Sequence, residues 1–335
     1  MHTYIIAECG VNHNGNVKTA LKMVDAAKDA GCDCVKFQTF KAENLVTLNA
    51  PKAKYQLENT NGIDSQFQML KKLELDDKCF QMIYEYCRAI NIDFMSTPFD
   101  IKSVDLLEDL GVKIYKMSSG DITNKQLLQY VAKKNKPMII STGMSTLEEV
   151  REAVDWIEQV GNSNINILHC TSNYPTSYDD VNMKAMLTLK KEFSYPIGYS
   201  DHTNGWVIPV MAVAMGAKII EKHLTLNKEM EGPDHKASLD TDELKNMVDS
   251  IRIVERAMGN GIKKPFESEI STRDVARKSI VLACGVKKGN LLTKDNMEIK
   301  RPGTGIPPKY IDELVGRTIR RDMGREEILK WEDIV

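Results

Sequence analysis

Short apolar runs and longer helical stretches alternate along the first three quarters of the chain. Eight runs of strand-forming residues are predicted strands, and they span Tyr4–Glu8, Cys34–Gln38, Asp93–Thr97, Ile114–Met117, Met138–Ser141, Ile165–His169, Ile197–Ser200 and Ile219–His223. Between them, apolar residues recur with a helical period at Ala20–Ala30, Phe80–Ile90, Ser103–Leu110, Gln126–Lys134 and Leu147–Val160. We expect capping boxes to open the last of these helices and one further helix, at Ser145 with Glu148 and at Asp240 with Glu243.

Apolar strands that alternate with helices are typical of a parallel sheet that is covered on its outside. Eight such units over about 260 residues match the size of a (β/α)8 barrel. An open, doubly wound sheet is the alternative fold. The residues after the first strand, CGVNHNG at Cys9–Gly15, lack the GxGxxG order of a dinucleotide site in such a sheet. We therefore predict an α/β chain that folds as a TIM barrel.

The pattern changes near the C-terminus. The stretch 263–275 is polar and contains Pro265, which is typical of a linker. Beyond it, short β-like runs at Ser279–Cys284 and Met297–Lys300 alternate with turn signals. We therefore expect a barrel domain at residues 1–262, a linker at 263–275 and a small β-rich domain at 276–335.

The charge and the cysteines limit the class of protein. Lys and Arg number 45 against 47 Asp and Glu, which gives a net charge of −2 and no basic field for nucleic acid. No apolar run approaches the roughly 18 residues of a membrane span, and the chain enters its first strand without a signal-like segment. The seven cysteines form no CxxC pair and are expected to be buried and reduced. We expect a cytoplasmic protein that binds neither nucleic acid nor membranes.

Polar residues gather where the predicted strands end, which is the active face of a TIM barrel. We expect the following residues to face one mouth: Glu8, Asn12, His13, Lys36, Gln38, Thr97, Lys116, Ser118, Ser119, Asp121, Ser141, Thr142, His169, Tyr174, Ser200, Asp201, His202, Glu221 and His223.

Lys36 and Lys116 lie within apolar strands, where an unpaired ammonium group is costly. One interpretation is an ion pair with Glu8 or Glu221. The other is a bound phosphate or carboxylate, which would also accept hydrogen bonds from serines at the strand ends, namely Ser119, Ser141 and Ser200.

His202 and His223 end adjacent predicted strands. Each histidine by itself is compatible with a structural hydrogen bond. Together they suit Mn²⁺, Fe²⁺, Co²⁺ or Zn²⁺ acting as a Lewis acid on a carbonyl group. Asp234 follows the last strand and either accepts hydrogen bonds from a polyol or lies solvated in a Gly-Pro turn.

Motifs along the whole chain resemble the bacterial sialic acid synthase family. They are IIAECGVNHNG (Ile5–Gly15), VKFQTF (Val35–Phe40), STPFD (Ser96–Asp100), YKMSSGDITN (Tyr115–Asn124), IISTGMSTLEE (Ile139–Glu149), LHCTSNYPT (Leu168–Thr176), GYSDHT (Gly198–Thr203), IIEKHLTL (Ile219–Leu226), GPDHKAS (Gly232–Ser238), ARKSI (Ala276–Ile280) and KRPGTGI (Lys300–Ile306). The last two are similar to the antifreeze-like (SAF) domain that ends these synthases.

The resemblance implies an enzyme that condenses phosphoenolpyruvate with an open-chain N-acetylmannosamine-type sugar and water. The products would be a nine-carbon 2-keto sugar acid and phosphate, formed by C–O cleavage by a transferase that makes a carbon–carbon bond (EC class 2.5.1). By similarity, a divalent metal would bind His202 and His223, with Mn²⁺ expected first and Mg²⁺ or Co²⁺ as alternatives. Glu8 would act beside it as acid/base or orienting carboxylate.

The resemblance also assigns the substrate contacts. Phosphoenolpyruvate would be held by Lys36, Lys116, Ser119, Ser141, Ser172 and Ser200. The sugar would be contacted by Gln38, Thr97, Asp121, Tyr174, Glu221 and Asp234, and by Arg301 from the SAF domain of a partner in a domain-swapped homodimer. Asp121 replaces a usual Glu, and Ser172, followed by Asn173, replaces a usual Asn.

The identity of the sugar stays open at this point. We expect an N-acetylneuraminate synthase, and the alternative is an N,N'-diacetyllegionaminate synthase that uses 2,4-diacetamido-2,4,6-trideoxymannose. The stretches Val35–Leu45 and Pro51–Gln56 resemble a branch that contains both. Two alternatives of other classes are a Schiff-base aldolase that uses Lys36 or Lys116, and a non-catalytic carbohydrate-binding protein.

Overall fold

A computed structural model describes residues 2–60 and 65–335. The chain forms two compact units, Met1–Gly259 and Asn260–Val335. No helix in the described part of the chain has the length and apolar character that a membrane crossing requires.

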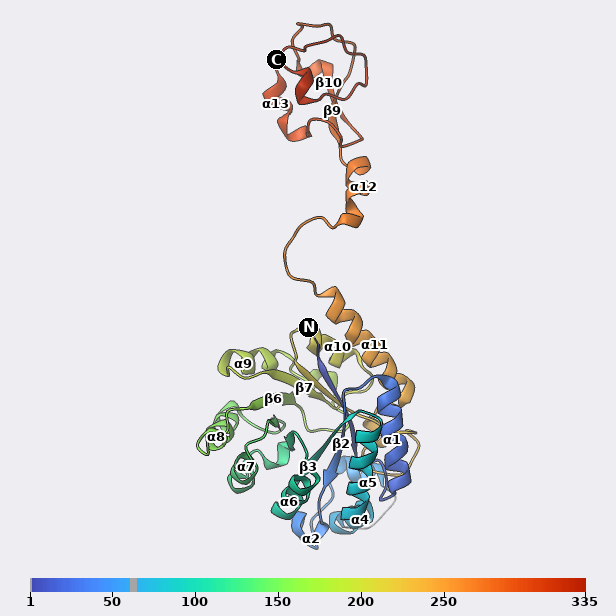
Figure 1. Ribbon diagram of the computed structural model, residues 1–335, viewed down its shortest axis with the longest axis vertical. Helices are drawn as coiled ribbons and strands as arrows, with labels where there is room; N and C mark the ends of the chain where they lie inside the picture. Colours follow the sequence, from blue (N-terminus) through green and yellow to red (C-terminus); the bar gives the residue numbers. More distant parts are fainter. Residues whose placement is uncertain (1, 61–64) are drawn as a thin grey trace. The chain divides into compact units, whose positions relative to one another are not determined.

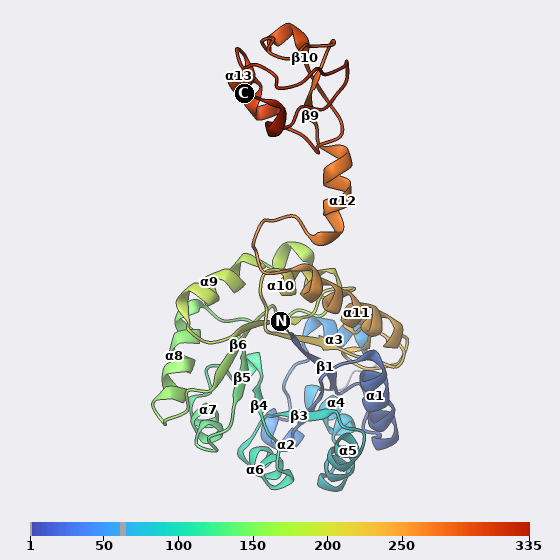
Figure 2. The same ribbon diagram turned by 45° about the horizontal axis from the view of Figure 1, so that its top comes forward.

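The first unit contains a sheet of eight parallel strands (Figures 1 and 2). They are β1 (Tyr4–Gly10), β2 (Cys34–Thr39), β3 (Asp93–Pro98), β4 (Tyr115–Met117), β5 (Met138–Ser141), β6 (Ile165–Cys170), β7 (Ile197–Asp201) and β8 (Ile219–His223). The hydrogen-bonded order is β3-β2-β1-β8-β7-β6-β5-β4, and β4 also packs beside β3. The first strand therefore pairs with the last, which confirms the TIM barrel and excludes the open doubly wound sheet.

Helices cover the outside of this barrel (Figure 2). They are α1 (Val17–Ala30), α5 (Asp77–Ala89), α6 (Ile101–Leu110), α7 (Lys125–Ala132), α8 (Leu147–Glu158), α9 (Lys184–Glu192), α10 (Val207–Ala214) and α11 (Thr241–Ala257). Their apolar faces and the outward side chains of the strands form the main core. Between β2 and β3 the chain inserts three short helices, α2 (Ala42–Leu45), α3 (Lys54–Asn59) and α4 (Gln66–Leu73).

One of the two predicted capping boxes is wrong by one residue. Helix α8 is capped by Thr146, which accepts a hydrogen bond from the Glu149 amide and donates its own amide to the Glu149 carboxylate. Ser145 donates instead to the Gly143 carbonyl. Ser145 with Glu148 and Thr146 with Glu149 have the same spacing of three residues, so the sequence pattern alone did not show which pair forms the capping box. The box at Asp240 and Glu243 is confirmed.

The second unit has its own small core around two antiparallel strands, β9 (Ser279–Leu282) and β10 (Met297–Lys300), with the short helix α13 (Ile311–Leu314). The stretch expected as a linker contains helix α12 (Glu267–Ala276), on which no residue is buried. Its first turn is held by the Phe266 amide, which donates to Glu269. All seven cysteines are free thiols, but two of them are not buried as expected, because Cys79 is half-buried and Cys284, in this unit, is exposed.

Candidate active site at the mouth of the barrel

Four buried charged side chains meet inside the barrel at the C-terminal ends of its strands. Lys36 Nζ lies 2.8 Å from Glu8 Oε2 and 3.7 Å from Glu221 Oε2. Lys116 Nζ lies 3.6 Å from Glu221 Oε1. None of the four side chains is more than 5 % exposed. Both lysines are therefore paired with glutamates, as the first of the two interpretations required.

The ionisation of this cluster favours a bound anion. Burial raises the pKa of Glu8 to about 7, although Lys36 opposes this shift. Burial would also raise the pKa of Glu221, but the charges of Lys116 and Lys36 lower it below its ordinary value. Near neutral pH, Glu8 is protonated for part of the time, while both lysines remain close to a single full carboxylate. Burial would lower the pKa of Lys36, but the charges of Glu221 and Glu8 raise it, whereas burial lowers the pKa of Lys116 below its ordinary value. A phosphate or carboxylate group beside the two lysines would stabilise the charged form of both.

Two serine hydroxyls bond to members of this cluster, and two others lie beside Gly143. Ser141 accepts a hydrogen bond from Lys116 Nζ at 2.7 Å, and Ser200 donates to Glu221 Oε1 at 3.0 Å. Ser119 accepts from the Gly143 amide at 3.0 Å. A side chain at Gly143 would stand 2.2 Å from Ser172 Oγ and 2.9 Å from Ser119 Oγ, so only glycine leaves these two hydroxyls in place.

The two histidines lie side by side at the ends of β7 and β8, with ring centroids 5.4 Å apart. His202 Nδ1 donates to the Thr171 carbonyl at 2.7 Å, so Nε2 is the ring nitrogen that could bind a metal ion. Burial would lower the pKa of His202, but Cys170 and the Thr171 carbonyl raise it above its ordinary value, so a metal ion at Nε2 would compete with a proton. Burial lowers the pKa of His223 well below its ordinary value, so its ring is neutral. Its Nδ1 has no hydrogen-bond partner among the described residues and lies 3.8 Å from Asp234 Oδ2.

These histidines fit a metal ion only in part. Neutral imidazoles with an oriented second nitrogen are the donors that a divalent transition metal uses. Residues 2–60 and 65–335 contain no group of three or more His, Cys, Asp or Glu side chains arranged to hold a metal ion. An ion held by His202 and His223 would therefore take its remaining ligands from water or substrate oxygens.

Aromatic rings continue from the histidines towards the solvent. The Tyr174 ring lies 4.1 Å from the His202 ring and meets the His223 ring edge-on at 5.6 Å. The ring of Tyr55, from helix α3, lies 4.9 Å beyond Tyr174. Gln38 donates to Glu8 Oε1 at 3.1 Å on the other side of the mouth.

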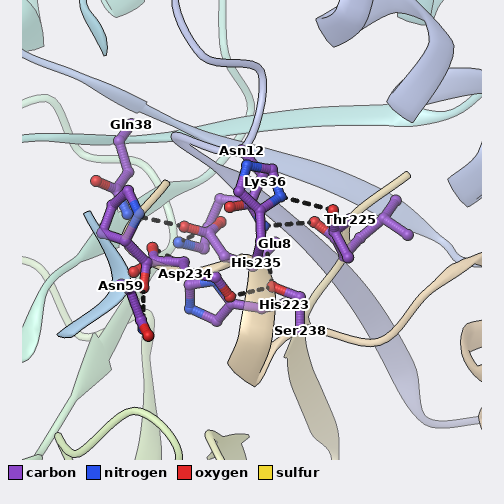
Figure 3. A network of polar contacts seen from close by, with 12 residues as sticks. Glu8, Asn12, Lys36, Gln38, Asn59, His223, Thr225, Asp234, His235 and Ser238 are labelled. Carbon is purple, nitrogen blue, oxygen red and sulfur yellow. Dashed lines mark hydrogen bonds and ion pairs between the residues drawn. The ribbon is translucent and has the colours of Figure 1, made fainter. Parts of the chain in front are cut away.

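A polar network fixes the loop after β8 (Figure 3). Asn12 Nδ2 donates to the Leu224 carbonyl at 2.8 Å and to Ser238 Oγ at 2.9 Å. Ser238 Oγ in turn donates to the Asp234 carbonyl at 2.7 Å. The loop after β1 therefore holds Asp234 at the mouth.

The geometry can be compared with known families. A model of the NeuB family matches residues 23–263, and a model of the SAF domain matches residues 277–335. The chain belongs to the NeuB family. The resemblance to the sialic acid synthases and the SAF domain at the C-terminus are both confirmed.

Relatives of this NeuB family chain match it over nearly its whole length. The N,N'-diacetyllegionaminic acid synthase of Legionella pneumophila is 48 % identical, over 100 % of this chain and 95 % of the relative. That of Campylobacter jejuni is 47 % identical, over 98 % and 99 %. The solved N-acetylneuraminic acid (sialic acid) synthetase of Leptospira borgpetersenii is 34 % identical, with a TM-score of 0.72, and the match covers 81 % of this chain and 90 % of that one.

Most of the predicted site residues of this NeuB family chain lie together. Thr97 accepts from Lys36 at 3.2 Å, and Glu221 lies deeper than the other predicted sugar contacts, between the two lysines. Asp121 accepts hydrogen bonds from Ser118 and Asn124 and so closes its own short turn. Arg301 belongs to the second unit, where it is exposed.

The expectation that every polar residue at the strand ends faces the mouth is wrong for Asp201 and His169. Asp201 pairs with the fully buried Lys222 between the sheet and the helices. His169 bonds to the Val181 carbonyl and packs on Tyr199. Side chains alternate along a strand, so these two point away from the interior that their neighbours line.

Sequence reasoning missed two residues at the mouth. Cys170 lies 3.8 Å from His202 Nδ1, and the alternation along β6 could have placed it inside the barrel. The Tyr55 ring lies against the Tyr174 ring although the two residues are 119 positions apart in the sequence, and no local pattern indicated that contact.

Proposed function

We propose that this NeuB family chain is an N,N'-diacetyllegionaminic acid synthase. It condenses phosphoenolpyruvate with 2,4-diacetamido-2,4,6-trideoxymannose and water, and releases phosphate. The sequence favoured N-acetylmannosamine as the sugar, with the diacetamido sugar as the alternative. Two relatives that are N,N'-diacetyllegionaminic acid synthases are each nearly half identical to this chain over nearly its full length. They make the diacetamido sugar the preferred substrate of the proposal. The observation that carries the proposal is the buried cluster of two lysines and two glutamates beneath two histidines.

Phosphoenolpyruvate would occupy the lysine cluster. Its phosphate and carboxylate groups would neutralise Lys36 and Lys116, and hydroxyls would complete the site, from Ser119, Ser141, Ser172 and Ser200. Preorganised cationic groups of this kind stabilise the charge of the departing phosphate without reorganisation during the reaction.

The carboxylates of Glu8 and Glu221 would stabilise the positive charge that develops during the reaction. As carbon 3 of phosphoenolpyruvate attacks the sugar aldehyde, positive charge develops at carbon 2, close to Glu8 and Glu221. Water then adds at carbon 2, and phosphate leaves with its bridging oxygen, so the C–O bond breaks. Glu8 has a pKa of about 7, which suits it to take up and return the proton of that water.

His202 and His223 would hold a divalent cation, with Mn²⁺ first and Mg²⁺ or Co²⁺ as alternatives. When bound, it would supply Lewis-acid polarisation of the aldehyde oxygen. We expect treatment with EDTA to abolish phosphate release and added Mn²⁺ to restore it. We also expect calorimetry to detect Mn²⁺ binding to the wild type but not to His202→Ala. Full activity after EDTA treatment would show that the reaction does not need a divalent cation.

Arg301 would act in the barrel of a second copy, in a domain-swapped homodimer, and contact the acyl amide of the sugar. Arg301→Ala should then raise the KM of the sugar more than that of phosphoenolpyruvate. Mixing Arg301→Ala with Lys116→Met chains should restore activity, because a mixed dimer joins an intact barrel to an intact Arg301. Mixtures that stay inactive while forming dimers would show that Arg301 acts in the barrel of its own chain, and an Arg301→Ala variant that is fully active by itself would place Arg301 outside the site.

A substrate panel tests the function itself. Phosphate release from phosphoenolpyruvate is measured with 2,4-diacetamido-2,4,6-trideoxymannose and with N-acetylmannosamine. We expect a higher kcat/KM for the first sugar. A higher kcat/KM for the second sugar would restore the N-acetylneuraminate synthase, and the absence of phosphate release with either sugar would reject both functions.

The seven free thiols agree with the further proposal that the enzyme works in the reducing cytoplasm.

A further inference from the structure

Helix α3 brings to the barrel mouth Tyr55, a residue to which neither the resemblance nor the strand ends assigned a role in the site. It belongs to the insertion between β2 and β3, and Asn59 at its end donates to the Pro233 carbonyl at 2.9 Å, beside Asp234 (Figure 3). Tyr55 lies one turn earlier and is half-buried. The hydrogen bond of Asn59 therefore holds the end of helix α3 beside Asp234, and the Tyr55 ring lies against the Tyr174 ring, with centroids 4.9 Å apart and planes tilted by 31°.

The rings form a series that leads outward from the reacting centre. The lysine cluster lies deepest, the His202 and His223 pair comes next, then Tyr174 and finally Tyr55. The aldehyde must lie near the histidines, because carbon 3 of phosphoenolpyruvate attacks it from the lysine side. The rest of an open-chain sugar then extends past Tyr174 towards Tyr55.

Tyr55 offers an aromatic face and a free donor. Burial and the nearby charge of Asp234 raise the pKa of Tyr55 well above its ordinary value, so its hydroxyl keeps the proton. Among the contacts of the described residues, this hydroxyl accepts one long hydrogen bond, from Gln56 Nε2 at 3.4 Å, and donates none.

We propose that Tyr55 is a specificity-determining residue that contacts the end of the sugar farthest from its aldehyde. The proposal rests on the proposed function and names the group that selects its substrate. The diacetamido sugar carries a methyl group at carbon 6 and an acetamido group at carbon 4, and both gain from contact with an aromatic face. N-acetylmannosamine carries hydroxyl groups there, and a hydroxyl group that packs on the ring face loses water without gaining a hydrogen bond from that face.

The competing explanation is that Tyr55 only supports Tyr174. Loss of that support would weaken the reaction of both sugars equally, since Tyr174 lies against the histidines where the two substrates are alike. Selectivity between the sugars therefore separates the two roles, whereas overall activity does not.

The test measures kcat/KM for both sugars with saturating phosphoenolpyruvate in the wild type, Tyr55→Ala, Tyr55→Leu and Tyr55→Phe. We expect Tyr55→Ala to lower kcat/KM about tenfold for the diacetamido sugar and less than threefold for N-acetylmannosamine, with the KM of phosphoenolpyruvate unchanged. Tyr55→Phe keeps the ring and should keep the selectivity. Tyr55→Leu should lose part of it, and it replaces Tyr55→Ala if that variant does not fold.

The matched control is Tyr178→Ala, which removes an exposed tyrosine whose hydroxyl bonds to the Asn204 carbonyl. It should leave both sugars unaffected. An equal loss for both sugars in Tyr55→Ala, or an unchanged ratio, would overturn the role of Tyr55 while the synthase remains. A wild type that turns over neither sugar would reject the proposed function and this proposal with it.

Discussion

The two ends of the barrel interior are built on the same strands and have opposite character. At the lower end, where the strands begin, the inward side chains form an apolar plug of Ile6, Cys34, Met95, Ile139, Leu168 and Ile219. Two residues further along the same strands, the inward positions are Glu8, Lys36, Thr97, Ser141, Cys170 and Glu221. Backbone and burial are shared, so the side chains alone divide the interior into a supporting half and a reactive half.

The energetics of the two ends differ accordingly. Burying a large apolar side chain stabilises a fold by about 1.5–3 kcal/mol. Burying charged pairs such as Lys36 with Glu8 costs desolvation that their attraction hardly offsets. The lower end therefore contributes stability, and the upper end retains its charges for chemistry. The predictions below test this division.

The largest effect is expected from Lys116→Met. It removes one partner of a buried charge pair, a change that costs about 2–5 kcal/mol, so kcat/KM for phosphoenolpyruvate should fall at least about 30-fold in a phosphate-release assay. The control is Lys113→Met, which removes an exposed lysine just before the same strand, where it pairs with Asp93. A Lys116→Met variant within threefold of the wild type would show that the upper cluster is structural.

Acid should destabilise the loops above the upper end. His13 and His235 are buried there, and burial lowers the pKa of each to about 4. In the unfolded chain each histidine takes up its proton near pH 6.5. The free energy of unfolding is therefore largest above pH 6.5 and falls as the pH drops towards 4. At pH 5 the loss is about 2 kcal/mol for each histidine.

Urea unfolding at pH 7.5 and pH 5 measures this loss. His13→Asn should unfold with a smaller difference between the two pH values than the wild type. If the free energy of unfolding falls by the same amount between pH 7.5 and pH 5 in His13→Asn and in the wild type, protonation of His13 does not cause the loss.

The smallest effects come from two neighbours on β5 that share the inward face. Ile139→Val at the lower end should lower the free energy of unfolding by about 1 kcal/mol and leave kcat/KM within twofold. Ser141→Ala, two residues later, should lower kcat/KM for phosphoenolpyruvate about tenfold, because Lys116 loses its 2.7 Å hydrogen bond. The reverse pattern, with activity lost at Ile139 and kept at Ser141, would contradict the division of the interior.

The barrel could be predicted from the sequence because buried parallel strands are apolar on both faces and stand out from amphipathic helices. Lys36 and Lys116 were recognisable as charges in such strands. Their pairing with Glu8 and Glu221 was not decided, because it depends on which strands lie next to each other. Asp201 was misplaced because its position at a strand end was considered without the alternation along the strand. The contact of Tyr55 with Tyr174 joins distant segments, which local periodicity does not encode.

The pairing of β1 with β8 also sets an order in time. The ribosome makes Glu8 and Lys36 early, and Glu221 and His223 follow roughly 10–40 s later at about 5–20 residues per second. Until β8 is made, Lys36 and Lys116 lack Glu221 as a partner, and β1 lacks one of its two neighbouring strands. The buried cluster at the barrel mouth is therefore completed in one late step, and a chain released before its last strand would hold most of the charged residues of the cluster but no closed barrel around them.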